Sequence, residues 1–154
     1  VYLRFGRPKV PVFTNPNQKF EIGKGIKLIE GNDVTIVATG HLVWESIEAA
    51  KVLNELGISA EVINIHTIKP LDEKIILESV SKTKCIVSAE EHNYLGGLGE
   101  SISRVLSKNM PLPQEFVATD DTFGESGTPA QLMNKYGLNF DSIVEKVKKV
   151  IKRK

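Results

Sequence analysis

The sequence predicts an α/β protein with a largely parallel β-sheet covered by helices. Short runs of β-branched and apolar residues alternate along the chain with segments in which apolar residues recur at helical spacing. This alternation is typical of βαβ units. The chain has 154 residues, of which 41% are hydrophobic and 25% are charged. That size and balance suit one domain with its own core.

The first part of the chain predicts a connector followed by one strand and one helix. Residues 1–20 contain three of the seven prolines, a composition that suits an extended linker better than a helix. A short strand is expected at 25–29, and the run 34–38 predicts a stronger one. An apolar stripe over 43–56 predicts a helix, which Gly57 ends as a C-cap.

The middle of the chain predicts three more strands separated by helices. The runs at 58–65 and 85–89 are rich in β-branched residues, and Pro70-Leu71-Asp72 opens a helix between them. The glycine-rich turn at 96–99 precedes another helix. An edge strand is then expected at 115–118, after two prolines.

The end of the chain predicts two helices separated by Gly137. Thr128 and Pro129 form the N-cap and first turn of one helix, and Asp141 is expected to start the other. Basic residues near the C-terminus alternate with apolar ones, as on the solvated face of an amphipathic helix. We favour this interpretation over a nucleic-acid or lipid patch for Lys146, Lys148, Lys149, Lys152, Arg153 and Lys154.

Composition argues against several functional classes. The net charge of +1 provides no general attraction for nucleic acid or for an anionic membrane. The chain has no run of 18 apolar residues, so no membrane span is predicted. The single cysteine, Cys85, excludes an intrachain disulfide and fits a reducing cytoplasmic compartment. Because the sequence begins at Val1 within an apparent strand, we expect it to be cut from a longer chain.

Histidines follow three of the predicted strands. His41, His66 and His92 stand at strand carboxyl ends, and His92 follows Glu90 and Glu91. Ligand crevices of open α/β sheets lie at this edge. A carboxylate beside a histidine could transfer protons or bind a divalent ion. A structural or interface role is favoured for each histidine, and we treat His41, Glu91 and His92 as a possible crevice or interface.

The chain shows no convincing cofactor or nucleophile motif. The turn at 96–99 lacks the GxGxxG and GxxxxGK[ST] spacings, so a tight strand-to-helix turn is favoured over a phosphate loop. The segment 30–33 does not have the order of a magnesium-binding GDG segment. No serine lies in a GxSxG elbow. We therefore predict no catalytic, cofactor-binding or metal-binding residue in this chain.

Four segments in order resemble the C-terminal domain of transketolases. They are DVTIVATG (33–40), IKPLD (68–72), EEHN (90–93) and DTFGESG (121–127). The resemblance covers about residues 22–150. It implies a three-layer α/β/α sandwich with a five-stranded, mostly parallel sheet whose first strand is antiparallel.

The same resemblance implies a domain division. YLRFGRPKVP (2–11) looks like the last strand of the family's pyrimidine-binding domain with its linker, so residues 1–20 would be that connector and 21–154 the C-terminal domain. Thiamine diphosphate and magnesium would bind between the other domains, and none to this chain. Arg7 would bind a substrate phosphate, a task for which the planar guanidinium is suited. Strand order in the family would place Gly40 and His41 near Glu91 and His92.

The function implied is that of a transketolase, which transfers two-carbon ketol groups between sugar phosphates, as in the pentose phosphate pathway. This domain would support a cytoplasmic homodimer, together with the remaining transketolase domains or an N-terminal subunit, and would be inactive alone. A 2-oxoacid dehydrogenase beta subunit and a deoxyxylulose-phosphate synthase remain alternatives. A small-ligand or regulatory module at the histidine crevice is the alternative from another class.

Overall fold

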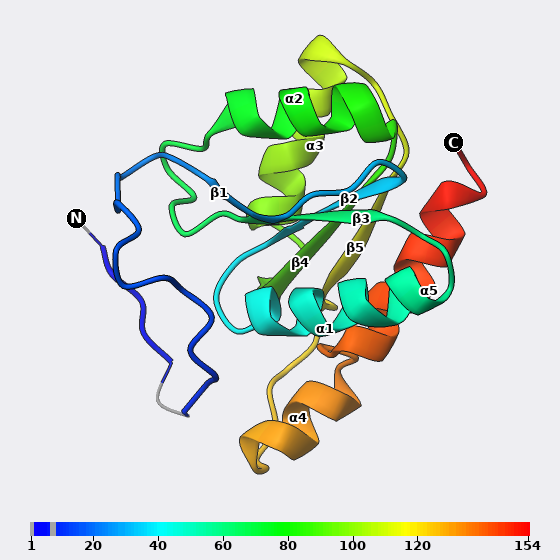
Figure 1. Cartoon of the computed structure of the whole chain (residues 1–154). Helices are drawn as coiled ribbons and strands as arrows, with labels where there is room; N and C mark the ends of the chain where they lie inside the picture. The colour runs from blue at the N-terminus through cyan, green and yellow to red at the C-terminus, as the bar shows by residue number, and fades with distance from the viewer. Residues whose placement is uncertain (1, 7–8) are drawn as a thin grey trace.

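The described part of the chain contains one five-stranded sheet in the order β1-β3-β2-β4-β5 (Figure 1). The structure is a computed structural model that describes residues 2–6 and 9–154. Strands β2 to β5 run parallel, and β1 pairs with β3 antiparallel. The bounds are β1 (Ile26–Ile29), β2 (Val34–Ala38), β3 (Ala60–Asn64), β4 (Ile86–Asn93) and β5 (Gln114–Thr119).

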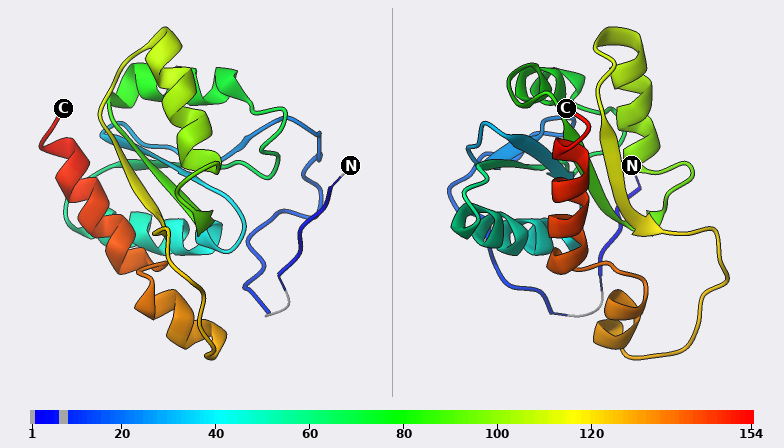
Figure 2. Two further views of the ribbon diagram at one scale, coloured as in Figure 1. Left: turned by 180° about the vertical axis from the view of Figure 1, so that it is seen from behind. Right: turned by 90° about the vertical axis from the view of Figure 1, so that its right-hand side faces the viewer.

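Helices cover both faces of the sheet and confirm the predicted α/β/α sandwich (Figure 2). On one face lie α1 (Leu42–Glu55) and α5 (Phe140–Ile151). On the other lie α2 (Glu73–Thr83) and α3 (Leu98–Asn109). The short helix α4 (Pro129–Lys135) projects from the sandwich and contains no buried residue. Within the described residues, no helix is both long enough and apolar enough to cross a bilayer.

The core consists of two apolar clusters, one on each side of the sheet. Ile36 and Val62 point toward α1 and α5, where Leu53 and Val147 meet them. Val37, Ile63 and Ile86 point toward α2 and α3. Every residue of β2 is buried because helices cover both of its faces, which explains its continuous apolar run.

Local capping signals decide where most helices begin. The Asp72 side chain accepts a hydrogen bond from Ile75 N at α2, and Thr128 forms a capping box with Gln131 at α4. The start predicted for α5 was wrong. Asn139, with extended dihedrals, caps the Ser142 amide, so Asp141 lies inside the first turn.

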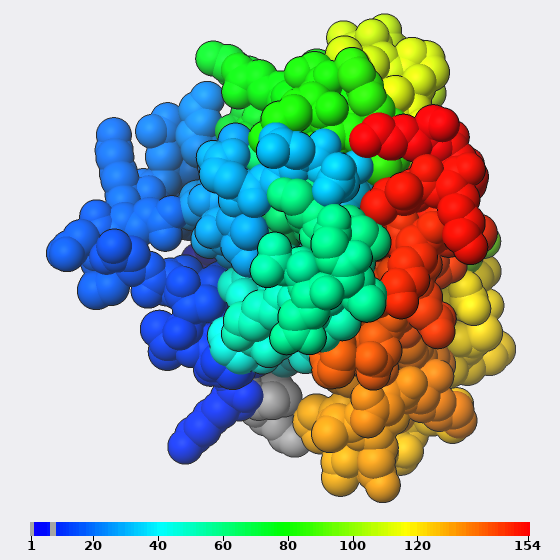
Figure 3. Space-filling model, turned by 45° about the vertical axis from the view of Figure 1, so that its right-hand side comes forward, coloured from blue at the N-terminus to red at the C-terminus, as the bar shows by residue number. Residues whose placement is uncertain are grey.

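The N-terminal segment lies along the side of the sandwich, outside the sheet. Residues 2–6 and 9–20 form no helix or strand, as expected for an extended connector. The strand-like segment at 2–11 has no partner strand in its described part, and a strand requires backbone partners. Figure 3 shows this segment in blue at one side of the molecule, with α4 in orange at the lower end.

Candidate functional site

The candidate site lies where β2 and β4 end side by side. Ala38 pairs with Ala89 in parallel register, so the turn after β2 meets the end of β4. Helix α1 leaves on one face and α3 on the other. This is the topological switch point at which open α/β sheets bind ligands. β4 extends to Asn93, so Glu91 and His92 belong to the strand and not to a following loop.

The structure brings His41 and Glu91 together at this point. His41 occupies the N-cap position of α1, and its side chain caps no helix amide. Its Nδ1 lies 3.6 Å from Glu91 Oε2, with side-chain exposures of 20% and 41%. These two residues therefore form a half-buried histidine–carboxylate pair.

The N-terminal segment covers this pair. Arg4 Nη1 donates a hydrogen bond of 3.3 Å to the backbone oxygen of Glu91. Gly6 lies so close to the His41 ring that a Cβ at this position would overlap Nε2. Residues of the N-terminal segment thus contact both members of the pair.

The other candidate residues do not join the pair. His92 is exposed, and its Nδ1 donates to the backbone oxygen of Asn93 at 2.7 Å. Neighbouring strand residues point to opposite faces, which separates its side chain from that of Glu91. His66 stacks on Phe20 with ring centroids 4.5 Å apart. Arg7 lies outside the described residues.

Glu90 has a role that the sequence reasoning missed. Its side chain is buried and points toward α3, where it accepts hydrogen bonds from Leu98 N at 2.7 Å and Gly99 N at 2.8 Å. Gly97 allows this approach, because a Cβ there would overlap the carboxylate. The first amides of α3, which could otherwise receive a phosphate, are therefore satisfied internally. A carboxylate at a strand end before a Gly-Gly turn is the sequence signal for this arrangement.

The described residues do not fit a diphosphate–magnesium cofactor. In residues 2–6 and 9–154, no group of three or more His, Cys, Asp or Glu side chains is placed to hold a metal ion. The glycine turn offers its amides to Glu90.

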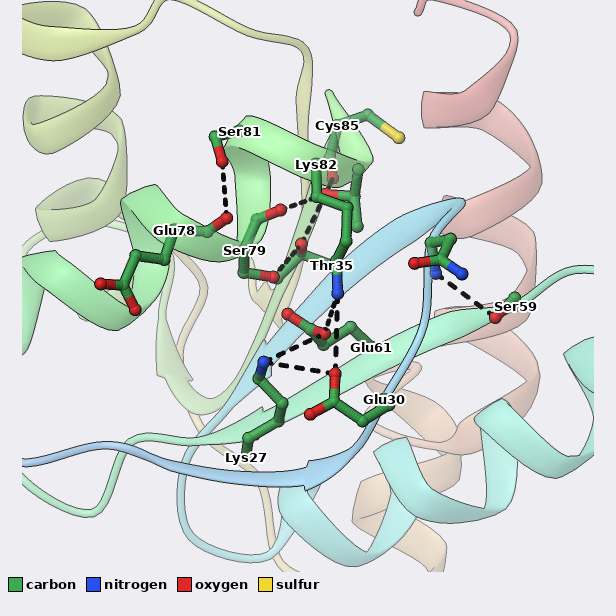
Figure 4. A network of polar contacts seen from close by, with 12 residues as sticks. Lys27, Glu30, Thr35, Ser59, Glu61, Glu78, Ser79, Ser81, Lys82 and Cys85 are labelled. Atoms are coloured by element: carbon green, nitrogen blue, oxygen red, sulfur yellow. Dashed lines mark hydrogen bonds and ion pairs between the residues drawn. The ribbon is translucent and has the colours of Figure 1, made fainter.

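A buried carboxylate at the opposite edge of the sheet forms a charged network (Figure 4). Glu61, at the start of β3, has a fully buried side chain and lies 2.5 Å from Lys82 Nζ and 3.4 Å from Lys27 Nζ. Glu30 pairs with the same lysines at 3.6 and 3.3 Å. Burial raises the pKa of Glu61, but the hydrogen bond from Lys82 and the charge of Lys27 outweigh this and hold it at about 2.

Hydroxyl groups fill the space beside this network. Thr35 Oγ1 lies 2.6 Å from both the Ser79 and the Thr83 hydroxyl (Figure 4). These groups are buried between β2 and α2 and satisfy one another. The network as a whole is a structural element of the core.

A second buried carboxylate at the same edge revises the interpretation of the C-terminal basic residues. Glu115, at the start of β5, is 8% exposed and lies 2.9 Å from Lys149 Nζ and 3.7 Å from Lys146 Nζ. Arg153 also contacts it. Burial raises the pKa of Glu115, but these cations outweigh burial and lower it. Three residues expected on a solvated face thus neutralise a buried charge, because α5 packs against β5.

Comparison with known proteins decides the family. The family model described as "Transketolase, C-terminal domain" matches residues 23–143. The chain belongs to the transketolase C-terminal domain family. The three-layer sandwich with one antiparallel strand is the architecture that the resemblance implied.

Relatives of this transketolase C-terminal domain are longer proteins. The "6-deoxy-6-sulfo-D-fructose transketolase subunit SqwH" of Clostridium sp. (strain MSTE9) is 42% identical over 154 residues, which are 100% of this chain and 48% of that protein. The 1-deoxy-D-xylulose-5-phosphate synthase of Caldanaerobacter subterraneus is 35% identical over 96% of this chain and 24% of its own length. The chain thus spans half or less of these relatives.

A solved structure shares the fold closely. It is described as "Split gene transketolase, inactive beta4 tetramer" and matches 95% of this chain and 48% of its own, with a TM-score of 0.92 and 43% identity. This agreement confirms the predicted fold class.

Proposed function

We propose that this chain is the C-terminal part of a thiamine-diphosphate-dependent transketolase that transfers two-carbon ketol units between sugar phosphates. The observation that carries the proposal is the 42% identity, over the whole chain, to a protein named as a transketolase subunit. Residues 1–20 would connect it to a pyrimidine-binding domain, and 21–154 would be the C-terminal domain. Cys85 is a free buried thiol, which suits a reducing cytoplasm.

We place the cofactor and the chemistry in the rest of the enzyme. The described residues provide no group of metal ligands, and the amides at the start of α3 are used by Glu90. Thiamine diphosphate, when bound there with magnesium, would supply the carbanion chemistry of ketol transfer. From this chain, Arg7 would bind the substrate phosphate through its paired donors. The isolated domain would therefore be inactive.

We infer that the domain also serves as an assembly surface for the remaining transketolase domains, or an N-terminal subunit, and for a homodimer. Residues 120–131 are all exposed, and Phe123 is 98% exposed. The loop is nevertheless held in place, since Asn93 bonds Asp121 at 3.1 Å and Lys135 bonds Glu125 at 2.6 Å. An exposed aromatic residue on an ordered loop is suited to anchor an interface.

The proposal is tested by reconstitution. The purified chain, alone and combined with the rest of the enzyme, is assayed for ketol transfer with thiamine diphosphate and magnesium. We expect turnover only in the combined sample. Turnover by the chain alone would contradict the assembly role. Condensation of pyruvate with glyceraldehyde 3-phosphate would favour the synthase alternative, and copurification with an acyltransferase the dehydrogenase alternative.

The small-ligand module is disfavoured because the chain itself contacts the His41–Glu91 pair. Gly6 lies against the His41 ring, and Arg4 bonds the backbone oxygen of Glu91. Calorimetric titration of the chain with nucleotides, sugar phosphates and divalent ions checks this directly, and binding that His41→Ala abolishes would revive that alternative.

A further inference from the structure

Strand β5 has one edge that faces away from the sheet. It is the last strand in the sheet order and pairs with β4 on its other side (Figure 2). The backbone oxygens of Pro113 and Thr119 accept hydrogen bonds from the β4 side. Because backbone groups alternate in direction along a strand, the N–H and C=O groups of Gln114, Phe116 and Ala118 point outward.

Phe116 and Ala118 form the open part of this edge. At its start, Arg153 Nη1 donates a hydrogen bond of 3.2 Å to the Gln114 oxygen. Within residues 2–6 and 9–154, the outward groups of Phe116 and Ala118 form no hydrogen bond. An edge strand with free backbone groups is a template for pairing with another chain.

A groove runs along the open part of the edge. It has a volume of about 220 Å³ and is lined by Tyr94, Glu115, Phe116, Ala118, Asp120 and Lys146. Glu115 and Phe116 are neighbours in the strand, so their side chains point to opposite faces of the sheet. A groove that touches both lies against the edge itself. It therefore provides space for the backbone of another strand.

The charges beside this edge change sign from its start to its end. Lys146, Lys149 and Arg153 gather around Glu115 near the start of β5. Asp120, directly after the end of β5, is exposed. The start of the edge is therefore basic and its end is acidic.

Helix α5 has the same polarity beside the strand. It runs antiparallel to β5, and Arg153, just after the helix, reaches Gln114 at the start of the strand (Figure 2). The first turn of α5 contains Asp141, and its last turn contains Lys148 and Lys149. Helix and strand thus present basic residues at one end of the edge and acidic residues at the other.

We propose that the edge of β5 pairs antiparallel with the same edge of a second copy of this chain. With the twofold axis at Val117, Phe116 lies opposite Ala118 of the second copy, and these residues exchange both backbone hydrogen bonds. A large side chain then lies beside a small one. Gln114 lies opposite Asp120 of the second copy, so the basic end of one copy meets the acidic end of the other.

A second copy satisfies both ends of the edge at once. An acidic segment from another protein would place like charges beside Asp120, and a basic segment would do so beside Lys149. β5 also leads directly into the exposed residues 120–131, so the pairing is continuous with the association surface proposed above. The inference rests on the homodimer part of the proposed function and on no catalytic claim.

Sedimentation and amide exchange of the 154-residue chain test the pairing directly. We expect a dimer as the concentration rises, and slower exchange of the Phe116 and Ala118 amides in the dimer than in the dilute monomer. A chain that stays monomeric up to about 1 mM would overturn the proposal. A dimer in which both amides exchange as fast as in the monomer would also overturn it.

A proline variant tests the backbone bonds. Ala118→Pro removes one outward N–H per copy and keeps the bonds to β4, because proline is tolerated where the N–H of an edge strand faces outward. It should raise the Kd of the dimer at least about tenfold. Ala118→Ser keeps the N–H and is the matched control, with the Kd of the parent. An unchanged Kd in Ala118→Pro would overturn the proposal.

A charge variant tests the edge without altering the strand, and so applies even where the proline variant does not fold. Asp120→Lys should raise the Kd about tenfold, because it places a cation beside those of the second copy. The difference should shrink in about 1 M salt. Glu78→Lys, on α2, makes the same change in net charge at an exposed position away from β5. Equal effects in both variants would overturn the proposed pairing.

The catalytic proposal is measured separately, by ketol transfer in the reconstituted enzyme. Turnover with a chain that does not dimerise would overturn the pairing and leave the catalytic proposal standing. A dimer through β5 without turnover in the combined sample would support the pairing and contradict the catalytic proposal.

Discussion

The two edges of the sheet hold their charged residues in different ways, although each contains a buried carboxylate: at the carboxyl edge, backbone amides of α3 hold Glu90. At the amino edge, Glu61 and Glu115 are buried and each is surrounded by cations. At the carboxyl edge, His41 and Glu91 are half-exposed and contact the N-terminal segment, and Phe123 stands in solvent. The amino edge therefore neutralises its buried charges with cations, whereas the carboxyl edge leaves several side chains exposed.

The difference has a physical cause. A carboxylate that leaves water must be paired, so the amino edge satisfies its charges within the chain. Loops at the carboxyl ends of parallel strands leave the sheet in different directions and expose side chains there. Variants at the two edges should therefore differ in whether they change stability or assembly.

The largest effect on stability is expected at Gly31, at the amino edge. A Cβ at this position would overlap the backbone of Ala60 and Glu61, which side-chain rotation cannot relieve. Gly31→Ala should lower the free energy of unfolding by about 3 kcal/mol, measured in urea. Gly124→Ala is the control in the exposed loop, where a Cβ meets nothing within 4 Å. An equal loss of unfolding free energy in both variants would show that the amino edge is no more important for stability than the exposed loop.

A smaller loss is expected when Glu61 loses its nearest cation. Lys82→Met keeps the apolar stem but leaves the buried carboxylate with Lys27 alone, 3.4 Å away. We expect the free energy of unfolding to fall by about 2 kcal/mol. This is less than the loss for a fully buried pair, because Lys82 is partly exposed. Lys74→Met provides a control, since its pair with Glu78 is exposed. Stability within about 0.5 kcal/mol of the parent would show that this pairing is not needed.

The pH dependence of stability should reflect the same buried carboxylate. The folded pKa of Glu61, about 2, lies below its ordinary value of 4.5. The ionised Glu61 side chain therefore stabilises the folded state fully above about pH 4.5, and this stabilisation is lost as the pH falls toward 2. Urea unfolding between pH 6 and pH 2 should show this loss, and Glu61→Gln should flatten the curve. An identical slope in that variant would assign the acid sensitivity to other groups.

The smallest effect on stability is expected at the carboxyl edge. Phe123 is 98% exposed, so Phe123→Ser should change the free energy of unfolding by less than about 0.5 kcal/mol. The same variant should weaken association with the other enzyme domains or a second copy about tenfold, since buried aromatic anchors dominate interfaces. Analytical ultracentrifugation of mixtures measures this, and unchanged association would exclude Phe123 as an anchor.

Local patterns predicted the elements well and the partners of charged side chains poorly. Strand runs and helix caps depend on a few neighbouring residues, so they are visible in the sequence. Examples are the runs at 34–38 and 85–89 and the caps at Asp72 and Thr128. Asn139 was missed because Asp141 is an equally acceptable capping residue, and backbone dihedrals decide between them. Boundaries are therefore less certain than the elements themselves.

The candidate site was predicted in part. His41 and Glu91 could be placed together because strand order follows from the resemblance, and β2 does lie beside β4. His92 was grouped with them because the sequence did not show that β4 continues past Glu90. Within a strand, the side chains of Glu91 and His92 point to opposite faces. Glu90 was noted only as a neighbour of His92, and the sequence did not show that its side chain points to the opposite face and accepts hydrogen bonds from the start of α3.

The sequence by itself determined the α/β class, the order of the elements and the family, because these depend on residue spacing along the chain. Only the tertiary structure decided that Glu115 neutralises Lys149 and that Gly6 lies against His41. The residues of these pairs are 34 or more positions apart, and contact between them depends on how the helices pack on the sheet.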